Sequence, residues 1–461
     1  MKKTFLPLLA ALLVCLGPTT ADARTRPERT ASGPAGNISE QLNFDKTLRV
    51  DCIFSGTAEE QEIAVAELCS LDGWAGRRVN LDRPPLRGNG QILLRDTLGN
   101  ILYANAFSTL FQEWQATEEA TRTRKSFENV FLVPMPRVKA ELSIRLFDVH
   151  GTVVREYAQT VLPEDILIRP LRQEAAPHVW LWKGGDPLDA PEVDSAHKID
   201  VAIVAEGYTE AEMDRFLEDA RATVESLWGH APFSTLKDRF NFVAVELPSE
   251  DSGVSVPREG VWKNTAVDSR FDTFYSARYL TTLHLFGLHD ALAGIPYEHI
   301  IILANTDTYG GGGIFNSYTL TTAHHAGFKP VVVHEFGHSF AGLADEYYYD
   351  DQYDPMYVAD TEPWERNITS QKDFASKWKN MVGRVYTLGL SDLDWEGRKQ
   401  TGPKVTVGLF EGGGYRSKGV WRGCEDCRMK TNTYPAFCPV CQQAIRDIID
   451  FYTRESAPTR P

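Results

Sequence analysis

Short runs of apolar residues, separated by polar turns, make up the first part of the chain. Between residues 47 and 170 the runs include LRVDCIF, QILLRD, NILYANAF, AELSIRLFDV and TVVREYAQTVL, whose lengths are typical of β-strands. Two stretches, LLRDTLGNILYA and LFDVHGTVVREY, place an Asp-x-x-Gly turn between two such runs, which predicts a hairpin in each. Short strands with turns at this spacing predict an antiparallel β-sandwich over residues 46–175.

The hydrophobic pattern changes after a linker at 176–197, which is rich in Gly, Pro and Asp. Three stretches are predicted to be buried strands: KIDVAIVAEGY, RFNFVAVEL and YEHIIILANT. Two others have helical spacing, TEAEMDRFLEDARATVESLWG, which begins with the capping box Thr209-x-x-Glu212, and SARYLTTLHLFGLHDAL. Strands that alternate with helices predict an α/β domain over residues 198–455.

A run of four glycines occurs within this second region, in YGGGGIFNSYTLTTA. The alternating residues that follow it, IFNSYTLTT, predict a strand. Two interpretations stay open for this strand: it lies inside the sheet, or it is an edge strand that pairs with an extended peptide.

The first residues have the features of a signal peptide. Lys2 and Lys3 precede an apolar run at 5–16 that is too short to span a bilayer, and small residues follow at 21–23. We therefore expect a signal peptide at 1–23, no membrane span, and a protein that is secreted or periplasmic. Residues 24–45, which are rich in Arg, Thr, Pro and Gly, are expected to form a loose leader.

Length and charge narrow the class of protein. A chain of 461 residues is too long for one ordinary core, which predicts two domains. The formal charge of −15 would repel phosphates, so a nucleic-acid partner is not expected.

Six cysteines follow the predicted signal peptide: Cys52, Cys69, Cys424, Cys427, Cys438 and Cys441. An even number in an oxidising compartment predicts disulfides, with Cys52–Cys69 as the pair in the N-terminal domain. The last four form two C-x-x-C pairs, which in a cytosolic protein would be typical of a zinc ribbon. A second zinc is therefore the alternative to disulfides at these four residues.

The sequence HEFGH, at 334–338, has the pattern of a metal site. On a helix His334 and His338 lie one turn apart, so both imidazoles can reach one metal ion, while Glu335 points to its open coordination position. The alternative is a helix with two ordinary core histidines. The first acidic residue after His338 is Asp345, which on a continuous helix would lie roughly 10 Å further along the axis.

The helix must therefore end before Asp345 if that carboxylate is to reach the metal. Gly342 lies where a residue in the left-handed conformation would end the helix and turn the chain back. A metal site requires such a break, whereas a helix with two core histidines does not.

The sequence HEFGHSFAGLADEY resembles the signature of the IgA-peptidase family of zinc metallopeptidases, a metzincin-like group. AEGYTEAEMDRFLEDA, APFSTLKDRFNFVAVELPSEDSG, NTDTYGGGG and CRMKTNTYPAFCPVCQQAI also resemble its catalytic domain, and the strands at 47–170 resemble its N-terminal domain. The resemblance implies an antiparallel β-sandwich followed by an α/β metzincin-like zinc metallopeptidase domain.

The same resemblance implies roles for individual residues. His334, His338 and an aspartate correspond to the metal ligands, and Glu335 corresponds to the catalytic glutamate. The usual third ligand of metzincins falls ten residues after the first histidine, where this chain has an alanine; Asp345 is the natural substitute and Glu346 the alternative.

Metzincins also place a methionine beneath the metal. Met429 matches this position best and Met381 second best. Tyr434, close to Met429 in the sequence, is a candidate to stabilise the oxyanion.

We therefore expect a secreted zinc-dependent endopeptidase that acts on proteins or peptides, with a metal-activated water as nucleophile and Glu335 as general base. The alternative is an exported binding or adhesion protein with a purely structural metal. Structural zinc usually has four protein ligands and does not need a glutamate beside the first histidine, which favours the enzyme. The physiological substrate and the oligomeric state are not predicted by the sequence.

Overall fold

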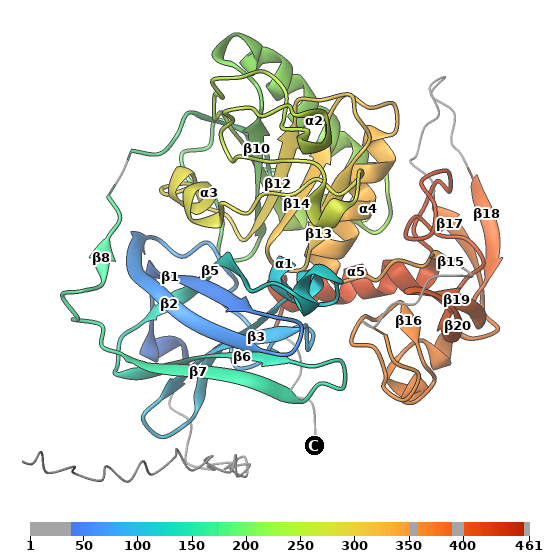
Figure 1. Cartoon of the computed structure of the whole chain (residues 1–461), viewed down its shortest axis with the longest axis horizontal. Helices are drawn as coiled ribbons and strands as arrows, with labels where there is room; N and C mark the ends of the chain where they lie inside the picture. The colour runs from blue at the N-terminus through green and yellow to red at the C-terminus, as the bar shows by residue number, and fades with distance from the viewer. Residues whose placement is uncertain (1–37, 173, 350–356, 390–400, 456–461) are drawn as a thin grey trace, which may run out of the picture.

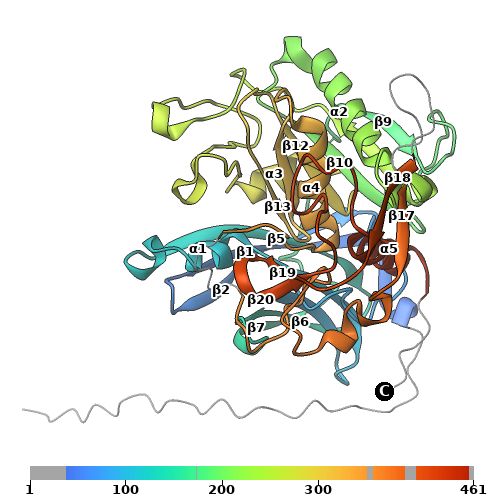
Figure 2. The ribbon, with the colours of Figure 1, turned by 90° about the vertical axis from the view of Figure 1, so that its right-hand side faces the viewer.

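The computed structural model describes residues 38–172, 174–349, 357–389 and 401–455. The predicted signal peptide (1–23) and the part of the predicted leader before residue 38 lie outside these ranges. The described chain forms two domains, and Figures 1 and 2 show the N-terminal strands, in blue, below the larger second domain. The predicted two-domain organisation is confirmed.

Two four-stranded sheets form the N-terminal domain, in the orders β5-β1-β2-β8 and β4-β3-β6-β7. Neighbouring strands are antiparallel except for β2 and β8, and the two sheets share one hydrophobic core. The elements are β1 (Leu42–Gly56), β2 (Gln61–Asp72), β3 (Gly90–Asp96), β4 (Ile101–Phe107), α1 (Leu110–Gln115), β5 (Lys125–Pro136), β6 (Ala140–Phe147), β7 (Val153–Val161) and β8 (Arg169–Pro170). β1 begins within the predicted leader because Leu42 already pairs with Pro136 of β5.

Both predicted hairpins are present, as β3–β4 and β6–β7. In each turn one aspartate, Asp96 or Asp148, accepts the backbone N–H groups two and four residues further on, at 2.8–2.9 Å. Gly99 and Gly151 have φ of +89° and +79°, a conformation that favours glycine. The Asp-x-x-Gly sequence therefore fixes these turns locally.

One six-stranded sheet is the centre of the second domain, in the order β13-β14-β12-β10-β11-β9. The four inner strands are parallel, and both edge strands are antiparallel to their neighbours. The strands are β9 (His178–Lys183), β10 (Ile199–Glu206), β11 (Phe240–Val245), β12 (His299–Ala304), β13 (Gly311–Ile314) and β14 (Tyr318–Thr322).

Four α-helices of the described chain belong to this domain: α2 (Met213–Trp228), α3 (Leu285–Ala291), α4 (Phe328–Ala341) and α5 (Pro439–Thr453). The predicted capping box is present before α2, with both Thr209–Glu212 interactions formed. Helix α4 packs against β13 and β14. Short 3₁₀ helices lie at Ile38–Gln41, Glu119–Thr121, Glu210–Glu212, Phe233–Thr235, Lys237–Arg239, Pro257–Glu259, Thr273–Tyr275, Phe374–Ser376 and Lys379–Met381.

Between α4 and α5 the chain forms small sheets, at the right of Figure 1. One sheet has the order β15-β20-β16, with β19 paired to β20, and the other joins β17 to β18. The strands are β15 (Tyr348–Tyr349), β16 (Ile368–Thr369), β17 (Val385–Gly389), β18 (Thr401–Thr406), β19 (Phe410–Gly413) and β20 (Tyr415–Arg422).

Two predicted elements differ from the structure. The helix predicted over 276–292 is helical only from Leu285, because residues before it pair with other segments: Arg270 with Thr281, and Tyr279 with Gly311. The glycine run and the residues after it form the hairpin β13–β14 rather than one strand. β14 lies inside the sheet, and the edge strand is the glycine-rich β13.

The predicted Cys52–Cys69 disulfide is wrong. Both thiols are free, and the register of β1 and β2 places Cys69 opposite Arg49 and Cys52 opposite Val65. The two cysteines are therefore offset by three residues, or roughly 10 Å along the strands. A disulfide requires Cα atoms within about 7 Å. The four later cysteines are also free thiols, all buried.

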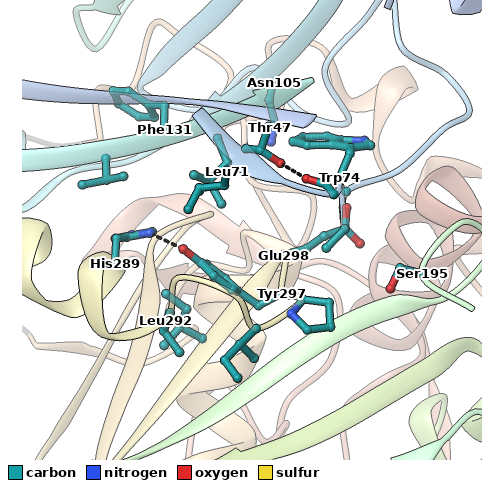
Figure 3. Close-up of a pocket in the computed structure, with 18 of the residues that line it drawn as sticks. Thr47, Leu71, Trp74, Asn105, Phe131, Ser195, His289, Leu292, Tyr297 and Glu298 are labelled. Atoms are coloured by element: carbon teal, nitrogen blue, oxygen red, sulfur yellow. Dashed lines mark hydrogen bonds between the residues drawn. The ribbon is translucent and has the colours of Figure 1, made fainter. Parts of the chain in front are cut away.

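The two domains contact each other through an ion pair between the buried Arg49 and the half-exposed Asp290, and they enclose a cavity. Arg49 holds Asp51 within the sandwich and Asp290 of the second domain, each at 2.7 Å. The cavity, of about 550 Å³, is lined from both domains, and Figure 3 shows Trp74 and Phe131 on one side and His289 hydrogen-bonded to Tyr297 on the other. No residue of the HEFGH sequence lines it.

Candidate metal centre

Helix α4 ends where the sequence predicts. Gly342 has φ of +58°, its N–H donates to the carbonyl of His338 at 2.9 Å, and the next N–H donates to Gly337 at 3.1 Å. A Cβ at Gly342 would lie 2.7 Å from the ring of Trp364 and 2.8 Å from Leu86. Both the left-handed conformation and the lack of space therefore require glycine here. The chain turns back at this point, which brings the following residues under the helix.

Three predicted residues converge after this turn. The Nε2 atoms of His334 and His338 lie 3.0 Å apart, and Asp345 Oδ1 lies 3.0 Å and 3.2 Å from them. Ligand atoms about 2 Å from a tetrahedral zinc would be separated by roughly 3.3 Å, close to these distances. Glu346, the alternative third ligand, makes no contact with either histidine and instead contacts Cys441.

The other ring nitrogens fix the direction of these imidazoles. His334 Nδ1 lies 3.0 Å from the carbonyl oxygen of Arg428, and His338 Nδ1 lies 2.5 Å from that of Leu343. Because a carbonyl only accepts hydrogen bonds, each Nδ1 carries the hydrogen and each Nε2 presents a lone pair. Two lone pairs that face each other at 3.0 Å repel unless a proton or a metal ion lies between them. The arrangement thus fits a metal ion.

Tyr415 orients the carboxylate of the set. Its hydroxyl donates to Asp345 Oδ2, which leaves Oδ1 facing the histidines. Oδ1 is buried, has no hydrogen-bond partner, and faces the two Nε2 atoms. Asp345 is thus held with one oxygen directed to the point where the Nε2 atoms meet.

The charges of this cluster shift its pKa values. Burial alone would raise the pKa of Asp345, but His338 and His334 outweigh burial and hold it below its usual range. For His338 burial is likewise outweighed, and the charge of Asp345 raises its pKa to about 9. Burial raises the pKa of Glu335, against the opposing effect of both histidines. The point between the three groups therefore favours positive charge, for which a metal and protons compete.

Glycines bring the edge strand β13 close to Glu335. A Cβ at Gly313 would lie 2.2 Å from the carbonyl oxygen of Glu335 and 2.9 Å from His338 Cβ. A Cβ at Gly311 would lie 3.3 Å from Glu335 Oε1. The glycine run is therefore what lets β13 pass directly over helix α4, with the partly exposed Glu335 carboxylate beside it.

Met429 lies against the helix between the two histidines. A Cβ at Gly337 would be 2.9 Å from Met429 Sδ, and Met429 is fully buried. The carbonyl of Met429 also accepts the N–H of Glu346 at 2.8 Å. Met381, the second candidate, is partly exposed in a 3₁₀ helix elsewhere. Of the two candidate methionines, Met429 is the one that packs against helix α4 between the two histidines.

Besides burial, the charge of Glu335 contributes to raising the pKa values of Tyr309, Tyr279 and Tyr347, but is not among the causes that raise the pKa of Tyr434. Burial and the charge of Glu335 raise the pKa of Tyr309, whose hydroxyl accepts a hydrogen bond from Asn432 at 3.2 Å. The pKa of Tyr434 is raised by burial and by Cys424 and neighbouring groups. Tyr434 therefore belongs to the surroundings of the cysteines.

Sequence reasoning missed several groups that shape the site. The carbonyls of Arg428 and Leu343 are backbone atoms, so no residue type marks them. Tyr415 lies 70 residues from Asp345, and nothing local to it signals the contact. Tyr309 directly precedes the glycine run, and that position was the available signal.

Comparisons with known families cover both domains. A family model described as IgA Peptidase M64 matches residues 189–402 and 397–449, and a model described as Peptidase M64 N-terminus matches residues 39–158. No curated protein matches the chain. Among the described residues, no helix has both the length and the apolar character needed to cross a membrane.

Proposed function

Because the chain belongs to the IgA peptidase M64 family and is thus a peptidase, we propose that it is a zinc-dependent endopeptidase whose second domain is of the metzincin-like α/β type. The observation that carries the proposal is the convergence of His334, His338 and Asp345 with Glu335 beside them. Imidazole and carboxylate ligands in a three-membered set suit zinc better than calcium or magnesium. Proteins or peptides are the substrates.

Each residue of the site has a separate task in the proposed reaction. His334, His338 and Asp345 hold zinc, which when bound lowers the pKa of water and polarises the scissile carbonyl. Glu335 accepts the proton of the attacking water on its carboxylate and passes it to the leaving amine. Its pKa, which burial raises, makes it a stronger base than an exposed glutamate. Tyr309 donates a hydrogen bond to the developing oxyanion.

The edge strand β13 supports an extended substrate. It lies at the end of the sheet and beside Glu335, so its backbone can align a peptide with the site. Gly311 is already bonded, since its N–H donates to the carbonyl of Arg278 at 3.2 Å. Of the three residues that follow, Gly312 and Ile314 are buried, and the partly exposed Gly313 is the part of the edge that we assign to substrate.

The alternative, an exported binding protein with a structural metal, is less favoured. A structural zinc is enclosed by four protein ligands, whereas here three groups converge and a carboxylate oxygen of Glu335 lies within 4.8 Å of the two imidazoles. Export remains part of the proposal: residues 1–23 form a cleaved signal peptide and the enzyme is secreted or periplasmic. The predicted domain limits, 46–175 and 198–455 with a linker at 176–197, stay part of the proposal with two changes: β1 begins at Leu42, and β9 (His178–Lys183) is assigned to the second domain.

Removal of metal tests the proposed function directly. The chain from residue 24 onward, purified without chelator, is expected to cleave members of a diverse peptide library. Exhaustive chelation should abolish cleavage because no other group in the site can activate water, and added zinc should restore it. Full cleavage after verified metal removal would contradict the proposal.

Tyr309→Phe tests the proposed oxyanion contact. Loss of one such donor is expected to lower kcat by about 10²–10³-fold while KM and zinc content stay unchanged. Tyr434→Phe is the matched control and should retain wild-type kcat, because Tyr434 lies by the cysteines. Equal kinetics of Tyr309→Phe and wild type would remove Tyr309 from the mechanism.

A further inference from the structure

Three cysteines and one glutamate converge outside the site described above. Sγ of Cys427, Cys438 and Cys441 and a carboxylate oxygen of Glu346 all lie within 4.8 Å of one another. All four side chains are fully buried. Cys427 belongs to the loop between β20 and α5, and Cys438 and Cys441 begin helix α5. We refer to these four residues as the thiol cluster.

Distances within the thiol cluster suit metal ligands rather than a disulfide. Sγ of Cys427 and Sγ of Cys441 are 3.7 Å apart, whereas a disulfide bond is about 2.05 Å long. Two thiolates that bind one tetrahedral zinc, each at about 2.3 Å, are separated by roughly 3.8 Å. The backbone N–H of Cys438 also donates to Cys427 Sγ at 3.2 Å, a contact that stabilises a thiolate.

The buried carboxylate of Glu346 gives independent support for a metal ion in the thiol cluster. Its Oε1 lies 3.0 Å from Cys441 Sγ and accepts Nδ2 of Asn367 at 3.1 Å. Its Oε2 is buried with no hydrogen-bond partner. A fully buried carboxylate with an unsatisfied oxygen is costly unless a cation accompanies it. Arg422 contributes positive charge nearby but does not hydrogen-bond Oε2, whereas a metal ion in the thiol cluster would give that buried carboxylate a direct partner.

We propose that Glu346, Cys427, Cys438 and Cys441 bind a second, structural zinc ion. Four protein ligands close such a site, in contrast to the three groups around His334. Cys424 is also buried and lies beside Cys438, but it is not among the four converging groups, and we assign it no ligand role.

The second zinc would fix the position of Arg428 and Met429, which contact the first site. Cys427 is followed by Arg428, whose carbonyl orients His334. Met429 comes next and packs against helix α4. Glu346 directly follows Asp345. One peptide bond, between Asp345 and Glu346, would link a ligand of the first site to a ligand of the second. Another, between Cys427 and Arg428, would link a ligand of the second site to the carbonyl that orients His334.

Metal counting tests the inference without an assay of activity. The wild-type chain, purified without chelator, should hold about two zinc ions, and His334→Ala should retain one. When cobalt replaces zinc in His334→Ala, the near-ultraviolet absorption of thiolate-to-cobalt charge transfer should appear. Absence of that absorption, or a His334→Ala chain with no metal, would overturn the inference. Neither measurement depends on whether a cysteine variant folds.

Substitutions then define the ligands. Cys441→Ser and Glu346→Gln should each lose one zinc ion, whereas Cys424→Ser and Cys52→Ser, which remove buried thiols outside the thiol cluster, should keep both. Loss of zinc in Cys424→Ser but not in Glu346→Gln would overturn the proposed ligand set. Disulfides between residues 424 and 441, found by peptide mapping without reductant, would overturn the site itself.

The result is separable from the proposed function. A chain that is not a zinc peptidase would still hold one zinc ion, sensitive to Cys441→Ser and insensitive to His334→Ala.

Discussion

Glu335→Gln is expected to lower peptide cleavage by about 10²–10⁴-fold or more while zinc content and thermal stability stay at wild-type values. The amide keeps the shape of the side chain but cannot accept the proton of water. Glu335 makes none of the contacts that join His334, His338 and Asp345, so the ligands should stay in place. Elemental analysis, thermal unfolding and kcat/KM on one peptide measure the three quantities.

Glu335→Asp provides the matched comparison. It keeps the base but withdraws the carboxylate by one methylene, and we expect an activity between those of wild type and Glu335→Gln. A Glu335→Gln enzyme that cleaves peptides at the wild-type rate would show that the proton is accepted elsewhere. If the wild type cleaves no peptide, the binding-protein alternative replaces the proposed endopeptidase function.

Asp345→Ala is expected to remove one zinc equivalent per chain relative to wild type and to abolish cleavage. The substitution leaves two imidazoles whose lone pairs still face each other at 3.0 Å, without the anion that offsets the charge of a metal. Because the measured quantity is a difference of one equivalent, the result does not depend on the second zinc site.

Tyr415→Phe is the graded control for this prediction. It keeps Asp345 but removes the hydroxyl that holds Oδ2, and the loss of such an outer contact typically weakens metal affinity by about 10–100-fold. Competition with a chromophoric chelator measures both variants. If Asp345→Ala retains its full zinc content, the third ligand lies elsewhere.

Elements encoded by neighbouring residues were predictable from the sequence. The two hairpins follow from Asp96 and Asp148, which accept N–H groups within their own turns. Helix α4 and its end follow from the spacing of the histidines and from Gly342. The three groups that converge were therefore predicted as a set, because a helix and one turn determine where they lie.

Features that depend on distant pairing were not predictable. Residues 276–284 have helical spacing but are not helical, because Thr281 pairs with Arg270 and Tyr279 pairs with Gly311. The Cys52–Cys69 prediction failed because an even number of cysteines does not give the register of β1 and β2. The contact of Glu346 with Cys441 spans 95 residues, and only the folded chain reveals it.

The distance along the sequence between helix α4 and the segment that contacts it at Arg428 and Met429 has a consequence for biosynthesis. His334 and the carbonyl of Arg428 that orients it are 94 residues apart. At about 5–20 residues per second, translation of that interval takes on the order of ten seconds. For that time a nascent chain carries the metal-binding helix without Arg428 and Met429. Activity that depends on the contact between His334 and Arg428 is therefore expected only after residue 428 has been synthesised.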